Sequence, residues 1–379
     1  MKLVLDGAQQ MLARSAADFM AKNDAILRLR ELRDADDDLG FSPQVWQEMA
    51  DLGWTGIPIA EEDGGLGLGL AEVILITEAL GRGLAPEPFI AAVVLAGSLL
   101  SDAGDDLKAG WIEPCIAGDR RLAVAFQETG ARFDLAHIET TATAVDDGWT
   151  LDGVKIQVMG GHLADGWIVS ARTAGDVADD AGITLFLVPA DRAGVSVVRQ
   201  SRIDSRNAAI VRLEGVRVGA GDIVGEIGAG LEILEKAVDR ATVALCGEML
   251  GGMSEAFDRT IAYLNEREQF GVLIGSFQAL KHRAAKMFIE RELARSVVMA
   301  AARAVDDSSD DARVQVSNAK ARCTDAYTLL TNEALQMHGG IGMTDEHDIG
   351  LFMKHARVAE MTFGDAAFHR NRFAELQGY

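Results

Sequence analysis

The first 120 residues carry apolar side chains at the three- and four-residue spacing that is typical of amphipathic helices. The spacing is clear over residues 8–22 and 43–53, and Ser42-Pro43 is a favourable helix start. A glycine-rich stretch, residues 61–69, leads into a further helix through Gly81. Because this stretch opens with three acidic residues, which would repel a phosphate, we interpret it as a connection between helices. We therefore predict an N-terminal helical domain over residues 1–120.

From about Arg121 the pattern changes to alternating apolar and polar positions, with many β-branched residues and Asp-Gly, Gly-Gly and Pro-Ala turns. This pattern predicts a small β-barrel-like domain over residues 121–225. The predicted strands are Leu122–Phe126, Ile138–Val145, Trp149–Val158, Trp167–Ala171, Ile183–Val188 and Ile210–Val218.

The helical spacing returns after Gly230 and continues to the end of the chain. It predicts a C-terminal four-helix bundle over residues 226–379, in which an acidic loop, residues 306–311, connects two helices. The predicted helices are 231–265, 276–306, 310–337 and 347–362. The predicted fold class of the whole chain is α+β, mostly α, with the β-domain between two helical domains.

Length, composition and charge exclude several classes of protein. With 379 residues, of which 49% are hydrophobic, the chain is long enough for two or three domains. A net charge of −22 would repel nucleic acid and anionic lipid, so we expect neither as a partner. No apolar run reaches the roughly 20 residues of a membrane-spanning helix. The apolar part of residues 1–6 is too short for a signal peptide, so we expect a cytoplasmic protein.

The three cysteines, Cys115, Cys246 and Cys323, lie far apart in the sequence. They lack the spacing of a zinc site or of a disulfide framework. We expect buried thiols and no bound metal.

Three motifs follow one another in the second half of the chain. They are Arg267–Gly271 (REQFG), Gly275–His282 (GSFQALKH) and Leu335–Thr344 (LQMHGGIGMT). In this order and spacing the chain closely resembles the acyl-CoA dehydrogenase family. The resemblance extends over about residues 8–376, and it implies the fold of that family: a helical domain, a β-domain and a helical bundle.

The resemblance implies an FAD-dependent oxidation of an acyl-CoA thioester to the trans-2-enoyl-CoA. In the family, a carboxylate removes the α-proton while the β-hydrogen leaves as a hydride to the flavin. A thioester α-proton is only weakly acidic, so the carbonyl group must be polarised and the base must be desolvated. The resemblance therefore requires a fixed glutamate.

In the family the flavin ring rests on the β-domain of one subunit, and the pyrophosphate and adenine reach the bundle of a neighbour. The resemblance gives Arg267 the pyrophosphate, the two glutamines hydrogen bonds to the cofactor, and the two glycines a close approach of the backbone. We call these positions the flavin half-site: Arg267, Phe270, Gln278, Gln336, Gly339 and Gly340.

The flavin-ring part departs from the family pattern at two places. The usual Thr-Glu-Pro segment is Gln127-Glu128-Thr129, so Gln127 replaces a hydroxyl that faces the flavin. The usual Trp-x-Thr is Gln157-Val158-Met159. Gln127 and Met159 are candidates for contact with the flavin, and packing in the β-core explains them equally well.

The position of the catalytic base also departs from the family. The two places from which family members abstract the α-proton correspond to Ala241 and Phe363, so the catalytic residue is unknown. Glu248 is a candidate substitute, although seven residues at 1.5 Å each place it about 10 Å along the helix from Ala241. Asp239 and Asp365 are further candidates. Solvated or capping carboxylates are the simpler interpretation, as are hydrogen-bonded helix ends for His338, His347 and His369.

This combination resembles one kind of heteromeric family member. There, one subunit carries the base, and a homologous partner without a base lends the flavin half-site across the interface. The chain also resembles the small subunits of pimeloyl-CoA dehydrogenases through Ala125–Glu128, Gly342–Glu346 and Phe363–Asp365. We therefore expect a heterotetramer with a homologous subunit, acting on an acyl-CoA from lipid or steroid catabolism.

Three other functions remain open at this point. The first is a self-sufficient dehydrogenase, as a homotetramer or homodimer, with a displaced base. The second is a flavin-dependent monooxygenase on the same fold, which needs no base for an α-proton. The third is a scaffold that has lost the cofactor.

Overall fold

The structure, a computed structural model, describes residues 4–379. The predicted N-terminal domain begins at Met1, so its first three residues lie outside the described range. The same holds for the first half of residues 1–6, which the sequence analysis compared with a signal peptide. The chain divides into two compact units. The bundle unit comprises Met1–Ala35, Gly69–Pro86 and Thr242–Tyr379, and the sheet unit comprises Asp36–Leu68 and Glu87–Ala241. The predicted boundaries near residues 120 and 225 stay predictions.

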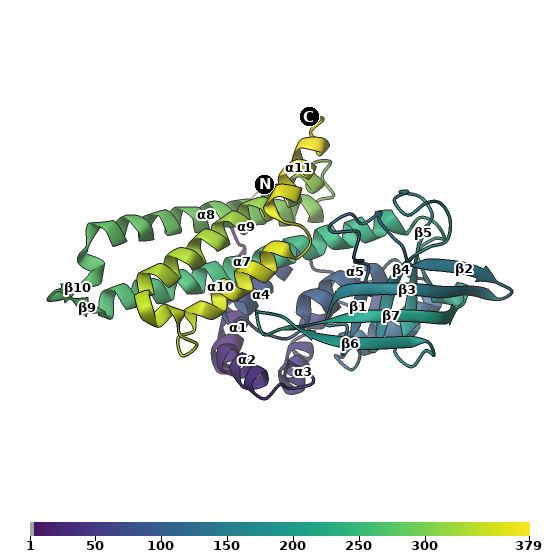
Figure 1. Ribbon diagram of the computed structural model, residues 1–379, viewed down its shortest axis with the longest axis horizontal. Helices are drawn as coiled ribbons and strands as arrows, with labels where there is room; N and C mark the ends of the chain where they lie inside the picture. The colour runs from purple at the N-terminus through teal and green to yellow at the C-terminus, as the bar shows by residue number, and fades with distance from the viewer. Residues whose placement is uncertain (1–3) are drawn as a thin grey trace. The chain divides into compact units, whose positions relative to one another are not determined.

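The sheet unit contains one eight-stranded sheet with the order β6-β7-β3-β2-β4-β5-β8, and β1 pairs with β4 (Figure 1). The pairing of β1 with β4 is parallel, and β6, β7, β3 and β2 form an antiparallel series. The strands are β1 Leu122–Ala125, β2 Thr141–Val145, β3 Gly148–Met159, β4 Gly166–Arg172, β5 Ile183–Pro189, β6 Val195–Ser201, β7 Asn207–Val218 and β8 Ile223–Val224. The longer helices of this unit are α3 Pro43–Asp51, the π-helix Ile90–Ala96, α5 Gly97–Leu100 and α6 Asp105–Ile116.

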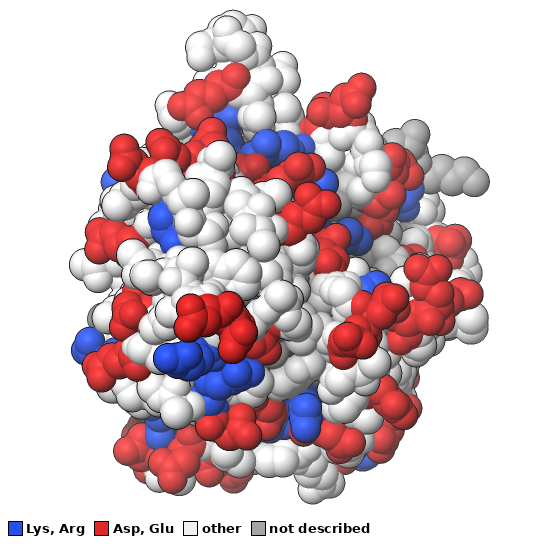
Figure 2. Space-filling view, turned by 90° about the vertical axis from the view of Figure 1, so that its right-hand side faces the viewer, with Lys and Arg blue, Asp and Glu red and all other residues white. Residues whose placement is uncertain are grey.

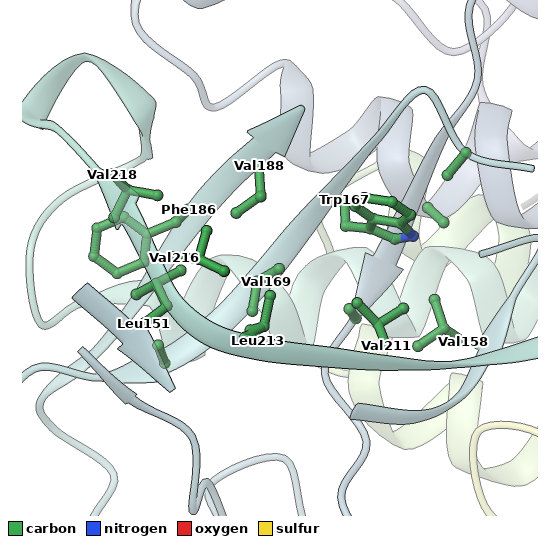
Figure 3. Close-up of a cluster of buried hydrophobic side chains, with 14 of the residues drawn as sticks. Leu151, Val158, Trp167, Val169, Phe186, Val188, Val211, Leu213, Val216 and Val218 are labelled. Carbon is green, nitrogen blue, oxygen red and sulfur yellow. The ribbon is translucent and has the colours of Figure 1, made fainter. Parts of the chain in front are cut away.

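A cluster of buried apolar side chains holds this sheet together (Figure 3). Phe186, Val188 and Val169 come from β5 and β4, and Val211 and Leu213 come from β7. Complete burial of a valine, leucine or phenylalanine contributes about 1.5–3 kcal/mol each. The predicted β-domain is confirmed, and its sequence pattern follows this core.

The bundle unit consists of helices and one two-stranded hairpin. Four of its helices correspond to the predicted bundle, and α11 is a further helix that the sequence analysis did not predict. The elements are α1 Gly7–Lys22, α2 Ala25–Asp34, α4 Leu70–Arg82, α7 Gly230–Glu266, β9 Glu268–Gln269, β10 Val272–Leu273, α8 Gln278–Asp306, α9 Ala312–His338, α10 Ile349–Met361 and α11 Ala366–Leu376. Helix α7 begins in the sheet unit and continues into the bundle unit from Thr242. The predicted fold class, α+β and mostly helical, is confirmed.

Helix α4 is capped by a residue far away in the sequence. The carboxylate of Asp306, at the end of α8, accepts hydrogen bonds from the N–H groups of Leu70 at 2.7 Å and Ala71 at 2.9 Å. A Cβ atom at Gly69 would lie 2.4 Å from this carboxylate, so a larger residue there would displace the capping side chain. The acidic loop predicted at residues 306–311 therefore also satisfies the free N–H groups at the start of another helix.

Acidic side chains outnumber basic ones on the face of the molecule shown in Figure 2, in line with the net charge of −22. Among residues 4–379, no helix is both long enough and apolar enough to cross a membrane.

Candidate functional site

The first part of the flavin half-site lies on the β9–β10 hairpin that follows α7. Phe270 and Gly271 form its two-residue turn, and both have positive φ values, 57° and 77°. Such turns match the twist of a hairpin. The turn leaves Phe270 93% exposed. Arg267 comes directly after α7, and its carbonyl accepts a hydrogen bond from the Ile274 N–H at 2.9 Å, which closes the hairpin.

The second part lies at the start of α8 and at the end of α9. Gln278 is the first residue of α8, and no side chain caps the N–H groups there. The N-terminus of a helix with free N–H groups favours an anion. Gln336 lies in the last turn of α9, and Gly339 follows that helix with φ 64° and ψ −141°, a conformation that favours glycine. Cβ atoms built at Gly339 and Gly340 would meet nothing within 4 Å.

Both parts lie toward the same end of the bundle, at the left in Figure 1. They are linked by the side chain of Tyr263, one turn before Arg267, which stacks on His338, directly before Gly339. Sequence analysis missed Tyr263 and assigned His338 only to a helix end. The signal available in the sequence was that Tyr263 lies four residues before Arg267 and that His338 directly precedes Gly339.

The residues of this half-site fit a dinucleotide cofactor such as FAD. Arg267, Gln278 and Gln336 are exposed, and within residues 4–379 their side chains make no hydrogen bond or ion pair. A guanidinium without a partner in the fold can pair with a phosphate group. The open backbone at Gly339 and Gly340 allows close approach of a ligand.

The two candidates of the flavin-ring part lie in the sheet unit and are both partly buried. The carbonyl of Gln127 accepts a hydrogen bond from the Ile156 N–H at 2.9 Å, so Gln127 runs alongside β3. The pairing of β3 with β7 shifts register between Lys155 and Val158, and Gln157 adopts a positive φ of 52° there. This bulge changes the direction of the strand just before Met159.

Between these candidates lies a buried ion pair that sequence analysis missed. Lys155 Nζ lies 2.6 Å from Glu128 Oε1 and donates to Ser170 Oγ at 3.0 Å. Glu128 also accepts from the Thr140 N–H, the Thr140 hydroxyl and the Glu139 N–H. Burial by itself would raise the pKa of Glu128, but the charge of Lys155 and these hydrogen bonds hold it below its ordinary value. The signal available in the sequence was Lys155, which lies between Val154 and Ile156 in a predicted strand.

Neither position that corresponds to a family base carries a group that can accept a proton. Ala241 is completely buried in α7. Phe363 is 6% exposed and lies in a strained turn, because its φ is 60° and that of Gly364 is 114°.

Two buried side chains hold this turn in place. Lys320 Nζ donates to the carbonyl groups of Gly364 at 2.7 Å and Glu360 at 3.1 Å. His369 Nε2 donates to the Phe363 carbonyl at 3.0 Å, so His369 is hydrogen-bonded near a helix start, as expected. Asp365 caps α11 by accepting from the Phe368 N–H at 2.8 Å.

Glu248 is enclosed in the bundle unit, where it faces His355 of α10, and His355 in turn contacts Tyr327 of α9. Its Oε1 lies 3.5 Å from His355 Nε2, and His355 Nδ1 lies 2.9 Å from the Tyr327 hydroxyl. All three residues are buried. This network occupies Glu248 inside the bundle. Asp239 is also buried, in the part of α7 that belongs to the sheet unit.

Comparison with known proteins agrees with the fold. Residues 6–119, 123–216 and 228–377 match the family models of the N-terminal, middle and C-terminal domains of acyl-CoA dehydrogenase. The chain is 30% identical to a 3-(aryl)acrylate reductase from Clostridium sporogenes, with 84% of this chain and 85% of the relative covered. It is 27% identical to the mitochondrial short-chain specific acyl-CoA dehydrogenase of Sus scrofa, with 95% and 88% covered.

A solved structure is similar over its whole length. The structure of the ChsE4–ChsE5 complex from Mycobacterium tuberculosis superposes with a TM-score of 0.90 at 27% identity, and 100% of each chain is covered.

Fold and half-site together define a flavin-dependent oxidoreductase. The chain belongs to the acyl-CoA dehydrogenase family. Its cofactor is FAD, and its class of reaction is the dehydrogenation of an acyl-CoA.

Proposed function

We propose that this chain is the subunit of a heteromeric acyl-CoA dehydrogenase that lends the flavin half-site and carries no catalytic base. One contrast carries the proposal. Arg267, Gln278 and Gln336 are exposed and have free polar groups, whereas the two family base positions hold enclosed apolar residues, Ala241 and Phe363.

The residues of this chain have distinct tasks in the proposed assembly. FAD, when bound, supplies the acceptor for the hydride. Arg267 neutralises the pyrophosphate, and the start of α8 offers free N–H groups to it. Gly339 and Gly340 let the backbone approach the cofactor, and Phe270 offers an exposed ring at its edge. The proton of the substrate is then taken by a carboxylate of the partner.

The surroundings of Glu248 do not favour the alternative of a self-sufficient enzyme with Glu248 as its base. Its neighbour His355 and the chain to Tyr327 account for its burial, because a buried carboxylate requires hydrogen-bonding partners. We therefore assign Glu248 to the interior of the bundle and expect Glu248→Gln to leave acyl-CoA-dependent flavin reduction in place.

The partner that we propose is a homologous acyl-CoA dehydrogenase subunit, in a heterotetramer. The exposed apolar side chains of the bundle unit favour such a partner. Phe288, Ile289 and Leu293 lie on α8 and are 46%, 55% and 49% exposed. Contiguous exposed apolar residues mark interaction surfaces. The ChsE4–ChsE5 complex is a precedent for two different chains together. We place the assembly in the cytoplasm, as the sequence predicts.

Expression alone and with a partner tests the proposal. The chain expressed alone should be poor in flavin or aggregate, and co-expression with a homologous subunit that carries a glutamate at either base position should restore flavin and acyl-CoA-dependent flavin reduction. A homotetramer or homodimer of this chain that holds one FAD per subunit and dehydrogenates an acyl-CoA unaided would contradict the proposal.

Restoring a carboxylate gives a second test. If this chain builds its own substrate site, Phe363→Glu should raise acyl-CoA-dependent flavin reduction by up to the ~10²–10⁴-fold that a positioned base contributes. Under the proposal this chain builds no such site, so the increase stays below about tenfold for Phe363→Glu and for Ala241→Glu. Phe363→Gln is the matched control without a base. If Glu248→Gln abolishes activity instead, the base is Glu248 and the chain is self-sufficient.

A further inference from the structure

A stack of aromatic rings joins the two parts of the flavin half-site. The Arg267 N–H donates to the Tyr263 carbonyl at 2.9 Å, so Tyr263 lies beneath the arginine at the end of α7. The rings of Tyr263 and His338 have their centroids 4.5 Å apart and are inclined by 26°. His338 is the last residue of α9, and Gly339 follows it. This contact therefore links the segment with the pyrophosphate ligand to the segment with the two glycines.

The hydrogen bonds of His338 define its protonation state. Its Nδ1 lies 2.8 Å from the Ala334 carbonyl, and because a carbonyl only accepts, Nδ1 carries the hydrogen. The other nitrogen, Nε2, is buried and has no hydrogen-bond partner among residues 4–379. A neutral ring leaves Nε2 without a hydrogen. A protonated ring would bury a charged N–H without an acceptor, which is costly.

The charged groups around the ring oppose a further positive charge. His347 lies over His338 with ring centroids 4.6 Å apart, and its Nδ1 accepts from the Ile349 N–H. Arg259 from α7 and Arg30 from α2 both pair with Asp348 at 2.9 Å. The nearby carboxylate is thus already shared by two arginines. Burial lowers the pKa of both His338 and His347, and the positive charge of Arg259 lowers them further.

We propose that His338 is a positioning residue: as a neutral ring stacked on Tyr263 it holds Gly339 and Gly340 beside Arg267, and its protonation loosens this half-site and weakens FAD binding. The inference rests on the proposed function for the identity of the ligand. His338 touches the two segments rather than the reacting atoms, so it acts through the position of the glycines and the arginine.

The sign of the pH dependence follows from the direction of the shift. In the ordered half-site His338 is buried on Tyr263, and in the loosened half-site it is exposed and has the higher pKa. Above about pH 6.5 the ring is neutral in both states, so pH does not change FAD affinity through His338. Below this value the loosened state binds the proton more readily. Affinity for FAD should then fall by up to about tenfold per pH unit for one group.

The experiment follows two quantities between pH 8 and pH 5, in the chain co-expressed with a homologous subunit and in the flavin-free chain. The first is the FAD retained by the assembled protein after gel filtration, measured by the fluorescence of released FAD. The second is hydrogen exchange of residues 336–349 in the flavin-free chain, corrected for the intrinsic effect of pH. His338→Phe keeps a ring on Tyr263 and cannot titrate. His137→Asn, at a partly exposed histidine of the sheet unit, is the control.

In the wild type, FAD retention and the protection of residues 336–349 should both fall below about pH 6.5. His338→Phe should remove this acidic limb, and His137→Asn should keep it. If His338→Phe does not fold, a second pair replaces it: Tyr263→Phe should retain FAD as the wild type does, and Tyr263→Leu should bind it about 2–13-fold more weakly, as loss of a ring stack predicts.

Two results would overturn the inference: an unchanged acidic limb in His338→Phe, or equal FAD retention in Tyr263→Leu and Tyr263→Phe. The exchange measurement separates this failure from failure of the proposed function. If no FAD binds at any pH while protection still falls with protonation of His338, the ligand assignment fails and the positioning role stands.

Discussion

The Glu128–Lys155 cluster of the sheet unit and the flavin half-site of the bundle unit place polar groups in opposite situations. Glu128 and Lys155 are buried, and both have hydrogen-bond partners within the fold. Arg267, Gln278 and Gln336 are exposed and have no side-chain partner within residues 4–379. A polar group that is satisfied internally contributes to the fold, and one that is left free by a rigid backbone is available to a ligand. Substitutions should therefore separate stability from cofactor binding.

The largest effect is expected at Lys155. Lys155→Met leaves the buried Glu128 carboxylate without its counter-charge, which should lower the free energy of unfolding by about 3–5 kcal/mol. Urea unfolding followed by circular dichroism measures this. The double variant Glu128→Gln/Lys155→Met should recover much of the loss, because a neutral amide replaces the unpaired charge. If the unfolding free energy of Lys155→Met lies within ~0.5 kcal/mol of the wild-type value, the contrast between the two regions is wrong.

Arg267→Ala should weaken cofactor binding and leave the stability of the fold unchanged. Loss of a charge-assisted hydrogen bond of about 1.5–3 kcal/mol weakens FAD binding by about 10–150-fold, and the exposed position leaves the unfolding free energy within ~0.5 kcal/mol. Flavin content after gel filtration checks the first expectation, and urea unfolding checks the second. Arg357→Ala, at an exposed arginine that pairs with Glu360 on α10, is the control. Unchanged flavin content would contradict the assignment of the half-site.

Lys320 gives a smaller effect that depends on pH. Burial lowers its pKa to about 8 from an ordinary 10.5. Between these values the unfolded chain binds more protons than the folded chain, so the contribution of Lys320 to stability increases as the pH rises. The slope is at most about 1.4 kcal/mol per pH unit. Unfolding at pH 8–10 should show a smaller slope in Lys320→Met than in the wild type, whereas Lys286→Met, on the exposed side of α8, should keep it. Equal slopes in all three proteins would refute this.

The sequence predicted those elements whose apolar spacing reflects the core. Strands β4 and β5, buried along their length, and helices α7 to α10 were found within a few residues of their bounds. Strand β6 was missed because most of its side chains are exposed or half-exposed, so burial imposes no alternation on it. Helix α11 lies beyond the last predicted helix, 347–362, and was missed because it buries only Ala366 and His369, which leaves no apolar spacing to detect.

The site was less accessible to sequence reasoning than the fold. Motif order was sufficient to propose the residues of the flavin half-site, and the structure places them at helix ends and in a hairpin turn. The contacts that organise it join distant positions: Tyr263 with His338, and Arg30 and Arg259 with Asp348. Glu128 was likewise quoted within a motif, but its pairing with Lys155 depends on how the segment after β1 lies beside β3. No local spacing encodes such contacts.

The cap that Asp306 provides for α4 has a consequence for how the chain is made on the ribosome. The carboxylate and the N–H of Leu70 are 236 residues apart. At about 5–20 residues per second, synthesis takes roughly 12–47 s to cover this distance. During this time residues 87–241, the larger part of the sheet unit, are synthesised and join residues 36–68, which were made before Leu70. Helices α1, α2 and α4 must wait for the C-terminal segment, so the oldest part of the nascent chain completes its packing last.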